Sequence, residues 1–214
     1  MSEIVFNTTG FNNYGFLSAK FSEEDILPIK TEINKIKQQF DLFDARKHNS
    51  NLAGNIMKEY TLLDSKKYAE HLIIPLLKEY DKQFNYVQNY NYLLNPAPIE
   101  LDTFWVNFQK KYEFNPIHKH DGIFSFVIWV NVPYNIEDEQ KLGPGINSNY
   151  NSAGGFSLLY ADAIGGILSH DIVVDKSKEN TIVIFPSKFH HCVYPFFSSD
   201  DYRISVSGNF KLRV

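Results

Sequence analysis

The sequence has few of the features that mark several common classes of protein. It contains a single cysteine, Cys192, which excludes an internal disulfide framework. The longest apolar run, Ile123–Val130, is interrupted by Ser125 and is far shorter than the roughly 20 residues of a transmembrane helix, so we expect no membrane partner. Its 21 basic and 25 acidic residues give a net charge of −4, which disfavours nucleic acid as a partner.

The first ten residues, MSEIVFNTTG, contain neither the basic stretch nor the apolar core of a secretory signal. Together with the lone cysteine, this predicts a reducing, cytoplasmic compartment. The chain of 214 residues is long enough for one domain with a sizeable core, and its 13 Tyr and 18 Phe favour a β-rich interior. We therefore expect a single globular domain over residues 1–214.

The period of the apolar residues changes near residue 101. Before that point, residues 22–40 and 65–84 repeat every three to four positions and predict amphipathic helices, separated by a long polar loop at 41–64. After it the period is two, which predicts antiparallel strands. These lie at 103–110, 123–132, 155–160, 166–174, 180–185, 191–196 and 202–210. The pattern indicates an α+β protein, mainly β: an N-terminal helical support region at 1–100, and a jelly-roll core at 101–214.

Two histidines at a spacing of two point to a metal site. On an extended strand, His118 and His120 project from one face and could occupy adjacent positions on one ion, whereas Asp121 would point the other way. A third ligand must come from a later strand, where His190 and His191 are candidates. Because neighbouring strand residues alternate, only one of that pair can face the metal.

An arginine on the last core strand suggests an anionic ligand. Alternation places Arg203 and Ser205 on one face of this strand, and a core-facing arginine needs a negatively charged partner. Apart from Asp200 and Asp201 in the preceding turn, no acidic residue is close in sequence. A bound carboxylate would satisfy the guanidinium.

These residues resemble the Fe(II)- and 2-oxoglutarate-dependent oxygenases of the double-stranded β-helix (jelly roll, cupin-like) fold, with a prolyl-hydroxylase-like core. The resemblance is nearest to phage-encoded members from marine cyanobacterial viruses, and it covers roughly residues 101–210. It rests on Glu113–Gly122, Ser125–Val127, Phe185–Ser187, His191–Pro195 and Arg203–Asn209. A weaker similarity lies at Leu52–Asn55.

The resemblance implies a dioxygenase that couples 2-oxoglutarate decarboxylation to succinate with the hydroxylation of an unactivated C–H bond. Fe(II) would be held by His118, His120 and His191, where most of the family has a carboxylate in place of His120. The family pattern favours His191 over His190. Arg203, with the Ser205 hydroxyl, would bind the distal carboxylate of 2-oxoglutarate, and O2 would be the second cosubstrate.

Alternatives remain open for the ligands. A local bulge could bring Asp121 to the metal in place of His120. In another arrangement, His120 is the first ligand and Gly122 occupies the carboxylate position, as in halogenating relatives. Asn107 could also hydrogen-bond the cosubstrate.

Alternatives also remain for the function. The chain could be a non-catalytic jelly-roll binding or virion-structural module, or a three-histidine cupin-type dioxygenase that does not use 2-oxoglutarate. The resemblance mildly favours a peptide or protein side chain as substrate, and a phage-encoded protein would act in the cytoplasm of an infected bacterial host. The segment 137–153, rich in Gly, Asn and Ser, is expected to be a mobile flap over the metal.

Overall fold

Two amphipathic helices form where the apolar period predicts them. The computed structural model describes residues 13–48, 54–89, 97–143 and 145–213, and its long helices are α1 (Glu23–Gln38) and α2 (Lys66–Phe84). Ser22 caps α1 in a reciprocal capping box with Asp25, which satisfies N–H groups at the helix start. In the described ranges, none of the helices has the length and apolar content needed to traverse a bilayer.

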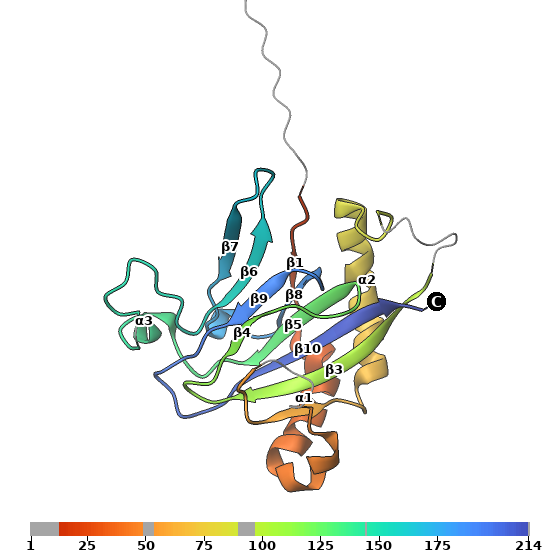
Figure 1. Cartoon of the computed structure of the whole chain (residues 1–214). Coiled ribbons are helices and arrows are strands. Elements are labelled where there is room, and N and C mark those ends of the chain that lie inside the picture. Colours follow the sequence, from red (N-terminus) through yellow and green to blue (C-terminus); the bar gives the residue numbers. More distant parts are fainter. Residues whose placement is uncertain (1–12, 49–53, 90–96, 144, 214) are drawn as a thin grey trace, which may run out of the picture.

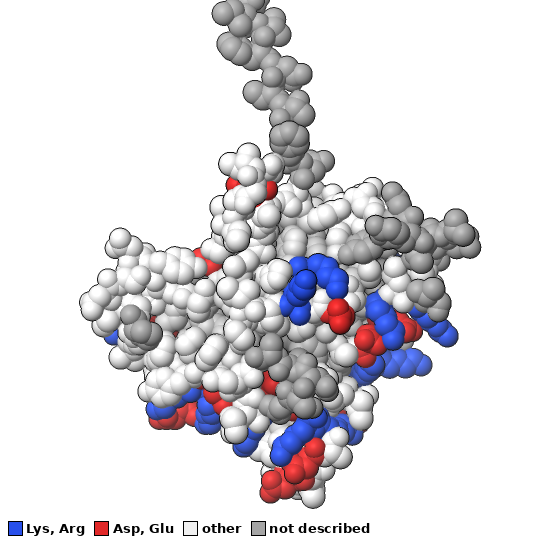
Figure 2. Space-filling view, in the orientation of Figure 1, with Lys and Arg blue, Asp and Glu red and all other residues white. Residues whose placement is uncertain are grey.

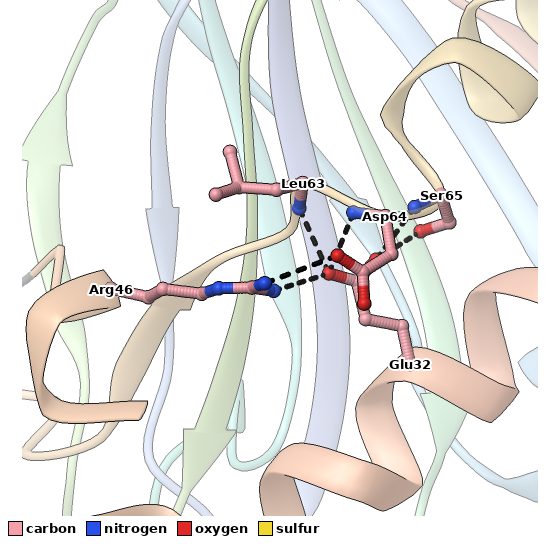
Figure 3. Close-up of polar contacts among 5 residues, drawn as sticks. All are labelled: Glu32, Arg46, Leu63, Asp64 and Ser65. Carbon is pink, nitrogen blue, oxygen red and sulfur yellow. Dashed lines mark hydrogen bonds and ion pairs between the residues drawn. The ribbon is translucent and has the colours of Figure 1, made fainter. Parts of the chain in front are cut away.

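A buried carboxylate on α1 organises the chain between the two helices (Figure 3). The Glu32 side chain, 2% exposed, accepts hydrogen bonds from the backbone N–H groups of Leu63, Asp64 and Ser65 at 2.8, 3.0 and 2.8 Å. It also accepts from the Ser65 hydroxyl at 2.6 Å and pairs with Arg46 at 2.9 Å. Arg46 is the last residue of a 3-10 helix, η1 (Phe40–Arg46), so one carboxylate holds η1 and the start of α2 against α1.

The strands form two antiparallel sheets (Figure 1), and side chains of both pack together in one apolar cluster. The major sheet has the order β1-β8-β5-β10-β3-β2, and the minor sheet has the order β4-β9-β6-β7. The major strands are β1 (Leu17–Lys20), β8 (Thr181–Pro186), β5 (Phe124–Asn131), β10 (Arg203–Leu212), β3 (Ile99–Gln109) and β2 (Glu59–Thr61). The minor strands are β4 (Asn115–His118), β9 (His190–Val193), β6 (Phe156–Ala161) and β7 (Ile167–Ile172). The expected mainly β, jelly-roll architecture is confirmed.

Strand β5 occupies the centre of the major sheet, between β8 and β10. Its residues from Phe124 to Val130 are all buried, as expected of a strand that is apolar on both faces. Phe124, Phe126 and Ile128 pack in the core beneath the helices, whereas Val127 and Trp129 belong to a second core between the sheets. The helices thus cover one face of this sheet, and the minor sheet covers the other.

The inner face of the major sheet changes from apolar to polar across its width. On β8 and β5 it presents Val183, Phe185, Val127 and Trp129. On β10, β3 and β2 it instead presents polar side chains: Arg203, Ser205, Ser207, Asn107, Gln109, Glu59 and Thr61. A hydrophobic sandwich therefore opens on one side into a polar interior.

The segment expected to be a flap has anchored parts. It begins with a short helix, α3 (Ile136–Glu139), whose Glu139 side chain is fully buried and accepts from the backbone N–H groups of Phe197 and Ser198 at 2.7 and 2.8 Å. The Tyr150 hydroxyl donates to Asp171 on β7 at 2.6 Å. The described residues of 137–153 are thus held at both ends by the protein surface, while residue 144 lies outside the described ranges.

Candidate functional site

Three imidazoles converge between the minor sheet and the turn that follows β4. His118 is the last residue of β4, and it lies opposite His191 of β9 in the strand register. Their ring centroids are 4.2 Å apart, and the His120 ring is 4.9 Å from His118 and 5.0 Å from His191. One nitrogen from each ring lies within 4.8 Å of the others, a spacing at which the three could hold a metal ion.

His120 reaches this cluster from outside a strand. The chain leaves β4 after His118, and the His120 backbone N–H donates to the Ser187 carbonyl at 3.0 Å. Its ring packs edge-on against Trp105, with centroids 5.7 Å apart. The two-residue spacing does bring both rings to one side. However, His120 is positioned by a turn that is bound to the residue after β8, where a continuous strand was expected.

Hydrogen bonds fix the orientation of two of the rings. His118 Nδ1 lies 2.6 Å from the Pro116 carbonyl, and His191 Nδ1 lies 3.1 Å from the Phe189 carbonyl. A carbonyl only accepts, so each Nδ1 must carry the proton and each Nε2 keeps a free lone pair. Such second bonds are typical of metal-binding histidines.

Burial keeps the cluster uncharged. Desolvation lowers the pKa of His118, lowers that of His120 to about 4, and lowers that of His191 well below its ordinary value. Mutual repulsion between the rings lowers the last two further. At neutral pH all three imidazoles are neutral, which is the protonation state that coordinates a metal.

The other candidates from this part of the sequence point elsewhere. The Asp121 side chain is fully exposed and pairs with Lys188 at 3.2 Å. Gly122 has φ +95°, and a Cβ there would approach the Phe210 carbonyl oxygen to 2.5 Å, so the position requires glycine for backbone reasons. His190 is exposed, on the opposite side of β9 from His191.

Arg203 faces the same cavity from the major sheet. Its side chain is 2% exposed, and each of its nitrogens donates to a neutral acceptor. Nε and Nη2 donate to Gln109 Oε1 at 3.0 and 2.6 Å, Nη1 donates to the Tyr134 hydroxyl at 2.8 Å and to the Gly154 carbonyl, and Nη2 donates to the Tyr194 carbonyl at 3.0 Å. The guanidinium is thus rigidly held without a carboxylate among these acceptors.

Ser205 and Asn107 lie beside Arg203 in a polar row. Asn107 Nδ2 is 3.2 Å from the Ser205 hydroxyl oxygen and 3.3 Å from that of Ser207. The Trp105 indole N–H donates to Asn107 Oδ1 at 3.0 Å. These side chains can exchange such contacts for hydrogen bonds to a ligand carboxylate placed next to Arg203.

One cavity joins the imidazoles to this polar row. Its polar wall is formed by His118, His120, His191, Arg203, Ser205, Ser207, Asn107, Gln109, Asn115 and Ser125. Its apolar wall is formed by Ile56, Trp105, Phe126, Val127, Trp129, Phe156, Phe185 and Val193, with Gly155 beside them. None of the described residues in 137–153 lines this cavity. The described part of the segment therefore does not form the expected flap over the metal.

Charge inside the cavity differs from charge outside it. On the face shown in Figure 2, basic and acidic side chains are interspersed and no large area has a single sign. Among the described residues that line the cavity, Arg203 is the sole cation, and no Asp or Glu is present. The cavity therefore carries a net positive charge opposite a neutral donor cluster, which suits an anionic ligand.

Sequence reasoning did not identify three polar residues of this region. Gln109 follows Trp105 and Asn107 at the alternating positions of β3, so period two could have found it. Tyr134 lies in a loop, and no sequence pattern indicates its role. Glu59 faces inward on β2 with 1% exposure, and burial, with repulsion from Glu113, raises its pKa to about 8. Residues 49–53 of the preceding loop lie outside the described ranges. They include part of Leu52–Asn55, the segment of weaker family similarity.

This chain is similar to known proteins in sequence and in fold. A protein-family model described as "Putative 2OG-Fe(II) oxygenase" matches residues 103–209. A prolyl-4-hydroxylase from Pseudomonas putida superposes with a TM-score of 0.53 at 16% identity, covering 94% of each chain. AviO1 from Streptomyces viridochromogenes Tue57 has a TM-score of 0.51 at 11% identity, covering 92% of this chain and 90% of its own.

A third solved structure shares the fold over most of this chain. A prolyl 4-hydroxylase from Phytophthora capsici has a TM-score of 0.51 at 12% identity, and the match covers 92% of this chain and 59% of that one. No curated protein matches this chain by sequence. At these identities the structural matches establish a shared fold, whereas the family-model match spans the cavity-forming strands.

Proposed function

This chain belongs to the 2OG-Fe(II) oxygenases, and from that premise we propose that it is a hydroxylase with its iron on His118, His120 and His191. Members of the family are oxidoreductases that use Fe(II), 2-oxoglutarate and O2. The bound iron would supply the oxidising chemistry: one oxygen atom of O2 enters a substrate C–H bond, and the other enters succinate as 2-oxoglutarate loses CO2. The observation that carries the proposal is the convergence of three neutral imidazoles in one cavity with a buried arginine.

The donor set fits Fe(II). Imidazole nitrogen is a common ligand for this metal, and Nε2 of His118 and His191 is left free by the carbonyl bonds at Nδ1. Three neutral ligands bring no negative charge, so the carboxylate of 2-oxoglutarate next to its 2-oxo group would supply the anionic charge at the metal. His120 in the usual carboxylate position is thus compatible with iron, and it makes cosubstrate binding more important for charge balance.

Arg203 and Ser205 would bind the distal carboxylate of the cosubstrate. Arg203 brings a positive charge, and the Ser205 hydroxyl, two residues along β10, offers a hydrogen-bond donor on the same face. Asn107 lies within contact of Ser205 and would complete this end of the site. The apolar wall around Phe156 and Phe185 would exclude water from the reacting atoms.

The primary substrate is proposed to be a side chain of a peptide or protein. Support comes from the shared fold with prolyl hydroxylases of P. putida and P. capsici. Ile56, on the segment that leads into β2, lines the cavity and would contact such a substrate. The family assignment favours this oxygenase over a non-catalytic jelly-roll module, and the presence of Arg203 favours a 2-oxoglutarate enzyme over a cupin-type dioxygenase.

The test is to supply purified protein with Fe(II), ascorbate and 2-oxoglutarate under air and to measure succinate. Slow succinate formation without substrate, increased by a library of proline-containing peptides, is the expected result. His191→Ala should abolish both signals, and His190→Ala, at the exposed neighbour, should leave both in place. Succinate formation that is equal in wild type and His191→Ala would contradict the proposed site.

A further inference from the structure

Arg203 is a buried charge whose surroundings do not neutralise it. A guanidinium has five N–H groups and stays protonated at any physiological pH. In this structure the five make hydrogen bonds to one amide oxygen, one hydroxyl and two backbone carbonyls. The ring of Phe196, 5.7 Å from the guanidinium carbon, covers one side. Every donor is satisfied, yet none of these partners carries a negative charge.

A buried arginine is generally paired with a group of opposite charge. A bidentate acceptor on Nε and Nη2 is the position in which Asp or Glu forms its strongest pair with arginine. Here the position belongs to Gln109, whose Oε1 contacts both nitrogens at 3.0 and 2.6 Å. Gln109 is itself 2% exposed, so its amide and the guanidinium interact with little water present.

The chemistry around Gln109 fixes which way its amide points. Gln109 Nε2 donates to the Glu113 carbonyl at 2.6 Å, while Oε1 accepts from Arg203. The reversed amide would place two donors against each other at Arg203 and two oxygens against each other at Glu113. The backbone turn at Glu113 therefore holds Gln109, and Gln109 holds the guanidinium against β3.

We propose that Gln109 is a positioning residue of the cosubstrate site that fixes the Arg203 guanidinium while leaving its positive charge available to the distal carboxylate of 2-oxoglutarate. This inference rests on the proposed function. A glutamate at the same position would still accept from Nε and Nη2, although it would lose the bond to the Glu113 carbonyl. It would also neutralise the guanidinium, so a second carboxylate would enter a site of zero net charge. Desolvating that carboxylate would then have much less electrostatic compensation.

The test compares two 2-oxo acids on the Mn(II)-loaded protein by titration calorimetry without oxygen. 2-Oxoglutarate has the distal carboxylate, and 2-oxobutyrate keeps the metal-binding 2-oxo acid group but lacks it. For Gln109→Glu we expect about a tenfold or greater loss of 2-oxoglutarate affinity, with 2-oxobutyrate and Mn(II) affinities within about twofold of wild type. Gln83→Glu, at an exposed position of α2, changes the net charge equally and should change none of the three.

A second variant separates charge from shape. Gln109→Leu leaves the charge on Arg203 but removes its clamp, so it should weaken 2-oxoglutarate less than Gln109→Glu and still prefer it to 2-oxobutyrate. If Gln109→Glu keeps the wild-type preference, or if Gln109→Leu binds 2-oxoglutarate as tightly as wild type does, the inference is wrong. If wild type itself does not prefer 2-oxoglutarate over 2-oxobutyrate, the assignment of Arg203 under the proposed function fails instead.

Discussion

His118 and His191 lie directly opposite each other on the antiparallel strands β4 and β9, with their ring centroids 4.2 Å apart. His191 is buried against Phe156 and Phe185, whereas His118 is half-buried. In both residues Nδ1 is bound to a carbonyl two residues earlier in the chain. The backbone thus sets the direction of both rings before any metal arrives. This preorganisation lowers the cost of binding an ion and makes the site sensitive to the loss of either ring.

We expect His191→Ala to weaken Co(II) or Mn(II) binding by about 100-fold or more, because it removes one of three donors and the most deeply buried one. Titration calorimetry on the folded variant measures this. The matched control is His190→Ala, the exposed neighbour on the same strand, which should bind metal as wild type does. Equal affinity for both variants would show that the metal lies elsewhere.

Replacement of His120 by aspartate tests whether the third imidazole position accepts the carboxylate that is usual in the family. We expect His120→Asp to retain metal binding, since the shorter side chain still offers an oxygen donor, whereas His120→Ala should lose most of it. Asp121→Asn provides the control, because that carboxylate is fully exposed beside Lys188 and should not matter. A large loss of metal in Asp121→Asn would instead indicate that Asp121 moves to the ion.

Arg203→Lys should lower 2-oxoglutarate affinity by about tenfold or more, or ~1.4 kcal/mol, because lysine keeps the charge but cannot make the hydrogen bonds that hold this charge in place. Metal affinity should stay close to that of wild type, since the guanidinium donates to other groups than the three imidazoles. Titration calorimetry with and without 2-oxoglutarate measures the metal affinity and the 2-oxoglutarate affinity separately. Unchanged 2-oxoglutarate affinity would remove Arg203 from the cosubstrate site.

Several parts of this arrangement could be predicted from the sequence, for physical reasons. The strands β3, β5, β6, β8 and β10 alternate or are largely apolar, so their period shows directly. The HxH spacing and the later His191 likewise identify a candidate donor set. Strands β1, β2 and β4 have only three or four residues, too few for a period, and they exist because a neighbouring strand pairs with them.

Other parts could not be predicted, because they depend on packing between distant segments. Gln109 and Tyr134 acquire their roles only when Arg203 is folded against them. Glu139 reads as an ordinary acidic residue of a polar loop, yet it is buried and anchors residues 197 and 198. Local composition made this segment look like a free flap, and long-range hydrogen bonds overrode that expectation.

The buried carboxyl of Glu59 should make stability depend on pH. Its pKa is raised to about 8 in the folded protein, against 4.5 for an ordinary glutamate, so the folded state holds its proton more tightly than the unfolded state. As pH rises from about 4.5 to 8, the unfolded chain releases this proton first, and the free energy of unfolding falls by up to a few kcal/mol. Denaturant unfolding at several pH values should show this slope.

The matching variant is Glu59→Gln, which cannot titrate. It should remove this fall, so that the stability difference between variant and wild type grows in favour of the variant from pH 5 to pH 8. Glu79→Gln, at an exposed position of α2, should leave the pH dependence of wild type intact. A constant difference between Glu59→Gln and wild type across this range would mean that the Glu59 carboxyl is ionised in the folded protein.

The two tryptophans of the chain offer a direct optical report on the site. Trp105 and Trp129 both line the cavity, and they are the only tryptophans in the sequence, so every indole signal comes from the site region. Trp105 packs against the proposed ligand His120 at 5.7 Å, whereas Trp129 packs against Phe156 at 6.0 Å on the apolar side.

Co(II) binding should therefore quench the fluorescence of Trp105 more strongly than that of Trp129. We expect Trp129→Phe to retain most of the metal-dependent quenching and Trp105→Phe to lose most of it, with Zn(II), which does not absorb visible light, as the metal control. Stronger quenching of the Trp129 signal would place the ion nearer the apolar wall than His120 allows.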